Sequence, residues 1–160
     1  MKITLAKALK LKNRFASKVG EVNRSIQSYN SVVEGQERPV DVSALMLRRE
    51  KLVDALVGLK TSISGANTSI QSTIYLLAEI KGDLTFLRGI DTSSGTQVQT
   101  VRWGGEDKVL TKTSILDFAT VQGLVEQAEA DIDANQDKLD KHNHTVEIEI
   151  DDDVVKLLRG

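Results

Sequence analysis

An apolar side chain recurs every three or four residues along the first part of this chain. The positions concerned are Leu11, Phe15, Val19, Val22, Ile26, Tyr29 and Val33. At the helical period of about 3.6 residues, this spacing places them on one face of a long helix. Similar stripes follow at Leu52, Leu56, Leu59 and Ile63, and at Phe118, Val121, Val125, Ala128 and Ile132. A chain with several such faces buries them by packing long helices side by side.

Capping and helix-ending residues predict where these helices lie. The sequence predicts four long helices, over about residues 4–33, 42–64, 70–88 and 115–141. Thr4 suits the N-cap of the first helix, and Gly35 and Pro39 end it. Asp41 or Ser43 suits the N-cap of the second. Because the connection between the first two helices is short, we expect them to run antiparallel.

The boundary between the second and third helices has two interpretations. Gly65 and Asn67 are typical of helix ends, so we expect a break there. The apolar phase nearly continues through Ala66 and Ile70, which leaves one long kinked helix as the alternative. The inner face of the third helix carries Ile74, Leu77, Ile80, Leu84 and Leu87.

Two segments have the character of strands. Residues 97–112 hold two runs of β-forming residues around Gly104-Gly105, which predicts a β-hairpin inserted before the fourth helix. Residues 145–150 alternate polar and apolar side chains, as in a half-exposed strand. That strand needs a partner, either the hairpin or a neighbouring subunit, and Val154–Leu158 can form a last short helix. The predicted fold is a single domain of residues 1–160: mainly α, an antiparallel bundle of about four long helices with an inserted hairpin and a C-terminal strand.

Composition narrows the protein class. Cysteine is absent, which excludes disulfides, thiolate metal sites and cysteine nucleophiles. Lys7, Lys10 and Lys12 interrupt the apolar start of the chain, so we expect no secretory signal. The longest uncharged run, residues 61–78, is too polar for a membrane span. We therefore expect a cytoplasmic protein without a transmembrane segment.

The two ends of the chain carry opposite charge. The basic residues near the N-terminus are Lys2, Lys7, Lys10, Lys12, Arg14, Lys18 and Arg24, against one acid, Glu21. Residues 126–153 hold eleven acids against Lys138 and Lys141. Nucleic acid is one possible partner of the basic helix, but aromatic stacking residues are scarce and we expect the cations to be spread around the helix. The acidic half of this protein, in the same or another chain, is the simpler partner.

Catalytic and metal-binding signals are weak. His142 and His144 are the only histidines, and they point the same way if that stretch is extended, which makes them weak metal candidates. The chain lacks a nucleophile elbow and a phosphate-binding loop. Asn135 interrupts the apolar stripe of the fourth helix, where a polar residue can set register or oligomeric state. We expect no catalytic residues, no cofactor, no small-molecule substrate and no enzymatic activity.

Several short motifs together resemble a known family. Leu5-Ala6-Lys7-Ala8-Leu9 opens the first helix, Asn30 to Pro39 forms the first turn, and Leu52-Val53-Asp54-Ala55-Leu56 leads on to Ile63 to Thr68. These segments, followed by a variable extended region and a last amphipathic helix, resemble the septicolysin-like family of small bacterial proteins. The resemblance implies an α-helical, oligomeric protein, and it carries over no catalytic residue.

The sequence thus favours a non-enzymatic structural or scaffolding protein, bacterial or phage-borne, that assembles with itself. Helices this long bury more surface when bundles associate. A membrane-acting toxin-like protein, as the family label suggests, and a nucleic-acid-binding accessory protein are the alternatives. The residues expected to form the packing or oligomer seam are Phe15, Val19, Val22, Ile26, Tyr29, Val33, Leu52, Leu56, Leu59, Ile63, Val121, Val125 and Ile132.

Overall fold

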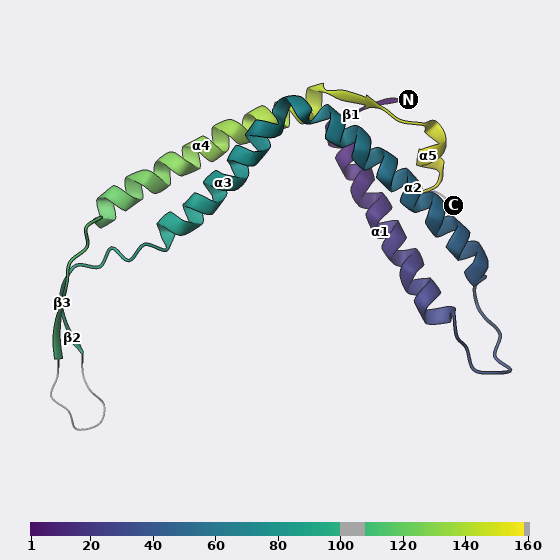
Figure 1. The fold of residues 1–160 in the computed structure, drawn as a ribbon, viewed down its shortest axis with the longest axis horizontal. Coiled ribbons are helices and arrows are strands. Elements are labelled where there is room, and N and C mark those ends of the chain that lie inside the picture. Colours follow the sequence, from purple (N-terminus) through teal and green to yellow (C-terminus); the bar gives the residue numbers. More distant parts are fainter. Residues whose placement is uncertain (100–107, 159–160) are drawn as a thin grey trace. The chain divides into compact units, whose positions relative to one another are not determined.

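The computed structural model describes residues 1–99 and 108–158 (Figure 1). The contacts within the chain group into two compact units: unit 1 comprises Met1–Gln71 and Asp140–Gly160, and unit 2 comprises Ser72–Leu139. The fold is mainly α, as predicted, with four long helices and short antiparallel strands in the described part of the chain. A single folding domain over the whole chain stays a prediction.

Two antiparallel helices form the body of unit 1. α1 (Leu5–Tyr29) and α2 (Val42–Ala66) lie side by side (Figure 1) and turn their apolar stripes toward a common core. The buried residues of that core are Ile3, Leu5, Ala8, Leu11, Phe15, Val22, Leu52, Leu59, Ile63, Ile148 and Ile150. Val19, Ile26 and Leu56 are half-buried against it. Most seam residues predicted in these two helices therefore lie in the core of one chain.

The first helix ends earlier than predicted, at Tyr29 rather than near Val33. The Arg38 side chain accounts for this end, because its Nε donates to the Tyr29 carbonyl and its Nη2 to the Asn30 carbonyl, each at 3.3 Å. Carbonyls in the last turn of a helix lack N–H partners within the helix, and here the Arg38 guanidinium donates to two of them. Gly35 then takes a φ of 85°, which favours glycine. Tyr29 and Val33 are consequently exposed.

The C-terminal strand has a partner that the sequence did not indicate. β1 (Lys2–Thr4) pairs antiparallel with β4 (Glu147–Glu149), with Ile3 opposite Ile148. The expected partner, the hairpin or a neighbouring subunit, is therefore wrong. The main-chain ladder continues on both sides of β1, where Leu5 N donates to the Val146 carbonyl at 2.9 Å and Ile150 N donates to the Met1 carbonyl at 3.0 Å. α5 (Asp152–Lys156) follows directly after β4.

The break after the second helix is confirmed. α2 ends at Ala66, a single 3-10 turn covers Thr68–Ile70 (η1), and α3 begins at Gln71 and runs to Arg88. Asn67 forms the junction, and its main-chain N–H still donates to the Ile63 carbonyl at 3.0 Å. The alternative of one continuous helix is wrong.

Unit 2 is a pair of antiparallel helices joined by a hairpin (Figure 1). β2 (Gly95–Gln99) and β3 (Lys108–Lys112) pair antiparallel, which confirms the predicted hairpin; its expected turn at Gly104-Gly105 lies outside the described residues. α4 (Phe118–Thr145) begins after Asp117, whose Oδ1 accepts from the Thr120 main-chain N–H at 2.8 Å. α4 starts three residues later than predicted and ends four residues later, and its last six residues belong to unit 1.

Candidate assembly surfaces

Unit 2 leaves more large apolar side chains exposed than it buries. Among its described residues, the buried apolar ones are Leu77, Val121, Val125 and Ala128. The exposed ones, which we call the unit 2 apolar surface, are Tyr75, Leu76, Phe86, Val109, Leu110, Ile115, Leu116, Phe118 and Leu124. In the described part of unit 1 the balance is reversed, with eleven buried and six large exposed apolar residues. Unit 2 therefore lacks a complete core of its own.

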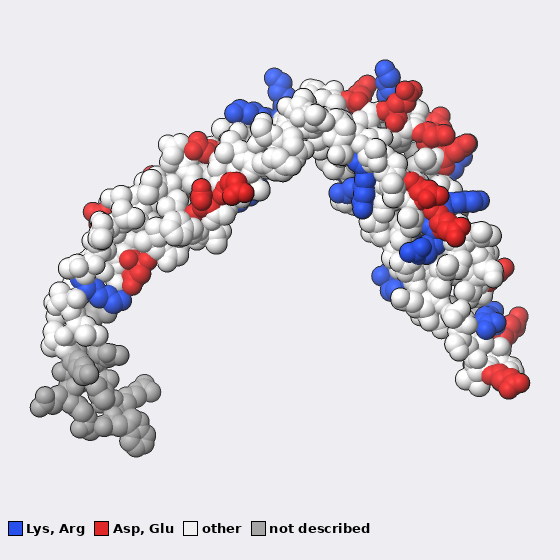
Figure 2. All heavy atoms as spheres, viewed as in Figure 1, with Lys and Arg blue, Asp and Glu red and all other residues white. Residues whose placement is uncertain are grey.

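Aromatic side chains are prominent in the unit 2 apolar surface. The chain has only three phenylalanines and two tyrosines, yet Tyr75, Phe86 and Phe118 are 64%, 68% and 70% exposed. Figure 2 shows broad uncharged areas over α3 and α4. Exposed apolar side chains are candidates for contact with a partner, and aromatic side chains supply much of the binding energy at the centres of interfaces.

The two helices of unit 2 leave a hollow between them near the hairpin. It has a volume of about 410 Å³, and its apolar lining includes Leu87, Ile90, Phe118 and Val125. The salt bridge between Arg88 and Glu129 joins the helices beside it. Leu87 and Val125 are residues that the sequence assigned to inner helix faces, so the predicted seam is only partly filled by this chain.

The buried Asn135 of α4 is satisfied within its own helix. Its side-chain Nδ2 donates to the Asp131 carbonyl at 2.8 Å, and its Oδ1 accepts from Lys138 Nζ at 3.3 Å. It is 8% exposed, which confirms that it lies at a seam position. Because its hydrogen-bonding groups have partners on α4, Asn135 needs no polar partner from another helix.

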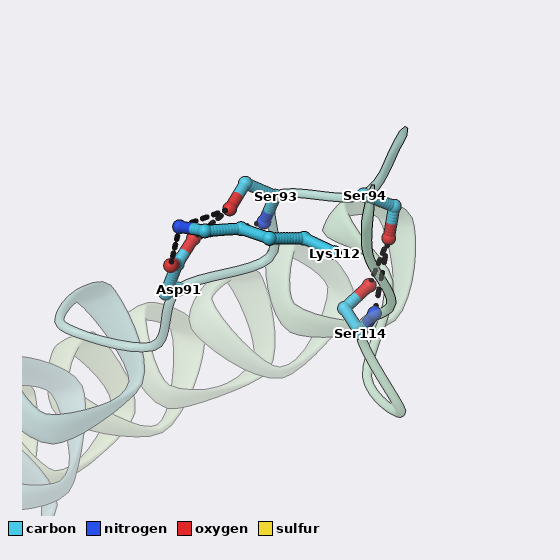
Figure 3. A network of polar contacts seen from close by, with 5 residues as sticks. All are labelled: Asp91, Ser93, Ser94, Lys112 and Ser114. Carbon is cyan, nitrogen blue, oxygen red and sulfur yellow. Dashed lines mark hydrogen bonds and ion pairs between the residues drawn. The ribbon is translucent and has the colours of Figure 1, made fainter. Parts of the chain in front are cut away.

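A polar network ties together the two segments that lead into the hairpin (Figure 3). Asp91 accepts hydrogen bonds from the Ser93 hydroxyl and main-chain N–H, and from Lys112 Nζ at 3.1 Å. Beside it, the Ser94 and Ser114 hydroxyls lie 2.7 Å apart. The hydrogen bonds from Ser93, with the Lys112 charge beside them, lower the pKa of Asp91 from 3.8 to about 2.

This network is suited to a structural role. A carboxylate with so low a pKa is a weak base, so Asp91 is not prepared to take a proton from the Ser93 hydroxyl. The network instead fixes where β2 and β3 leave the helices. The sequence indicates only a Ser-rich loop at residues 92–95. Lys112 reaches Asp91 because the register of the hairpin places Lys112 opposite Gly95, and this pairing is not visible in the sequence.

The two histidines lie in the last turns of α4, so the extended stretch that would align them is not formed. Side chains two residues apart on a helix do not face each other. Nor do the described residues contain any group of three or more histidine, aspartate or glutamate side chains placed to hold a metal ion. The Nε2 of His142 is buried without a hydrogen-bond partner in the described part of the chain.

A groove in unit 1, between α2 and the segment from β4 to α5, has a volume of about 490 Å³. Leu59, Ile150 and Val154 form its apolar floor. The charged residues of its lining are Lys51, Asp54, Glu149 and Asp151. This lining alone does not identify a ligand.

The cations of α1 are more ordered than predicted. Lys7, Lys10, Arg14 and Lys18 follow one another at helical steps of three, four and four residues, and we call them the basic stripe. Lys7, Lys10 and Arg14 line one shallow hollow, and Arg14 and Lys18 line the next. The expectation that the cations are spread around the helix does not hold for these four, because steps of three and four keep side chains on one helical face, whereas Lys12 lies off that face.

Comparison with known proteins gives no functional assignment: no protein-family model, curated protein or solved structure matches this chain. None of the helices in the described residues is both long and apolar enough to cross a membrane.

Proposed function

We propose that this protein is a non-enzymatic structural protein that builds a homo-oligomeric helical assembly, with unit 2 as its main contact region. The observation that carries the proposal is the unit 2 apolar surface. Helices and two-stranded hairpins are marginally stable in water unless their apolar faces are buried against a neighbour. Unit 2 therefore gains more stability from binding a partner than unit 1 does.

A second copy of the same chain is the partner that fits this surface. Two antiparallel helix pairs, each with an incomplete aliphatic face, complete one another as a four-helix arrangement. The hollow beside Leu87 and Phe118 offers space for side chains of the partner. Closed homo-oligomers are also the commonest form of soluble assembly, and the resemblance to the septicolysin-like family points the same way. We propose the cytoplasm as its location.

Solution mass, measured by size-exclusion chromatography with light scattering, tests the proposal. We expect the wild-type protein to have at least twice the mass of one chain. A variant with Phe86→Gln, Phe118→Gln and Leu124→Gln is expected to shift toward the monomer, because these side chains are exposed and their loss spares the buried core.

The matched control changes exposed apolar side chains of unit 1. Met46, Leu47 and Val57 are 43%, 62% and 56% exposed on α2, and their replacement by glutamine is expected to leave the mass unchanged. A wild-type monomer at every accessible concentration contradicts the proposal. An oligomer that responds only to the α2 variant contradicts the assignment to unit 2.

A further inference from the structure

The basic stripe of α1 lacks a counter-charge at three of its four positions. Lys18 Nζ pairs with Glu21 Oε2 at 2.9 Å. Among the described residues, the side chains of Lys7, Lys10 and Arg14 have no ion-pair partner, and all three are exposed. Like charges three and four residues apart on a helix repel one another, so this arrangement is unfavourable without an anionic partner.

Beside the basic stripe lies a shallow apolar floor. The hollow of about 250 Å³ that Lys7, Lys10 and Arg14 line is also lined by Ile3 and Val155. A helix placed against this floor can approach the cations closely, because aliphatic stems pack while the charged ends remain near water. The surface therefore suits a helical partner with carboxylates at matching intervals.

α4 carries carboxylates at the same intervals. Glu126, Glu129, Asp133 and Asp137 follow one another at steps of three, four and four residues, and we call them the acidic stripe. All four are exposed. Glu129 pairs with Arg88, and Glu126 accepts a hydrogen bond from Gln122 at 3.1 Å. In the described part of the chain, Asp133 and Asp137 have no ion-pair or hydrogen-bond partner for their side chains.

The two stripes match in length as well as in sign. Each covers twelve residues, so its first and last residues are roughly 16 Å apart along the helix at about 1.5 Å per step. We propose that the basic stripe of α1 binds the acidic stripe of α4 in a second copy of this chain. This inference rests on the proposed homo-oligomer and names its charged contact. In a two-fold symmetric pair, α1 of each copy meets α4 of the other copy. The contact therefore occurs twice.

Complementary charge reversals test the contact between copies. One variant carries Lys7→Glu, Lys10→Glu and Arg14→Glu, so that both of its stripes are acidic. The other carries Glu126→Lys, Asp133→Lys and Asp137→Lys, so that both of its stripes are basic. Each variant alone is expected to dissociate about tenfold or more readily than wild type, measured by analytical ultracentrifugation, because both stripe contacts become repulsive.

Mixing the two variants distinguishes contact between chains from contact within one chain. In a mixture, every acidic stripe meets a basic stripe of the other variant, so we expect hetero-oligomers that form about as readily as wild type. The control variant carries Arg24→Glu, Lys51→Glu and Lys60→Glu. It has the same change in net charge away from the stripe and is expected to assemble like wild type.

Three results overturn the inference. The first is a wild-type oligomer that neither variant weakens, which leaves the proposed function intact. The second is weakened assembly that mixing does not restore, which indicates that the stripes meet within one chain or act through folding. The third is binding of duplex DNA at about 0.1 M salt that the α1 variant loses while its assembly is unchanged. A wild-type monomer instead removes the proposed function itself.

Discussion

At the scale of single residues, Asp91 gives the sharpest expectation. Its pKa is lowered from 3.8 to about 2, chiefly by hydrogen bonds from Ser93 and then by Lys112. We expect Ser93→Ala to raise the pKa of Asp91 toward its ordinary value, and Lys112→Gln to raise it less. Carboxyl chemical shifts followed by NMR during an acid titration measure both. An Asp91 pKa that is the same in wild type and the Ser93 variant contradicts the network of Figure 3.

The sign of this shift also fixes its pH dependence. A carboxyl whose pKa is lower in the folded state stabilises the fold above its unfolded pKa, here 3.8. That contribution is lost as the pH falls from about 4 through about 2. Since Asp91 is exposed, we expect the loss to be confined to the base of the hairpin. Hydrogen exchange of the Ser93 and Ser114 amides across this range reports it.

At the scale of elements, the cap of α2 is the clearest target. Asp41 Oδ1 accepts from the Ala44 main-chain N–H at 3.0 Å, as the sequence predicted for an N-cap. Asp41→Ala is expected to lower the free energy of unfolding by about 1 kcal/mol, and Asp41→Ser by less, because serine still caps. Denaturant titration at one fixed protein concentration measures the difference.

The same substitution inside α2 is the control. Asp54→Ala removes an exposed aspartate from the middle of the helix, where alanine is the better helix former, so it is expected to be neutral or slightly stabilising. Equal destabilisation at Asp41 and Asp54 contradicts the capping role.

Local signals explain which elements the sequence predicts well. Helix periodicity and the caps at Thr4 and Asp41 act over a few residues, and α1 and α2 begin where these residues indicate. β1 has only three residues and forms because Ile3 and Ile148 meet across the length of the chain. The end of α1 depends on Arg38 reaching back to Tyr29 and Asn30. Contacts of this kind leave no local pattern to detect.

Of the two candidate surfaces, the sequence is sufficient to predict one, and only the structure shows the other. The basic stripe was present in the spacing of Lys7, Lys10, Arg14 and Lys18, and that spacing was sufficient to place them on one face. The exposure of Phe86 and Phe118 was not predictable, because apolar residues on a helix are consistent with either a filled core or an open surface. Only the packing of unit 2 shows which of these holds.

At the scale of the whole molecule, assembly links stability to protein concentration. If folded chains associate and unfolded chains do not, a hundredfold increase in concentration stabilises a dimer by roughly 1.4 kcal/mol per chain. For a chain of this length, that corresponds to a rise in Tm of roughly 3–6 °C. We expect this rise in the wild-type protein, measured by circular dichroism or calorimetry at matched heating rates.

The variant with Phe86→Gln, Phe118→Gln and Leu124→Gln separates assembly from folding. It is expected to lose the concentration dependence while keeping the Tm of the dilute wild-type protein, because the buried core of unit 1, with Phe15 and Leu52 at its centre, is unchanged. Raising the salt from about 0.1 M to about 1 M shortens the Debye length from about 10 Å to about 3 Å and screens the stripes but not the apolar contacts. A wild-type Tm that depends on concentration at low salt and much less at high salt assigns a large share of the assembly energy to the stripes. A Tm that is independent of concentration in both conditions contradicts assembly through either surface.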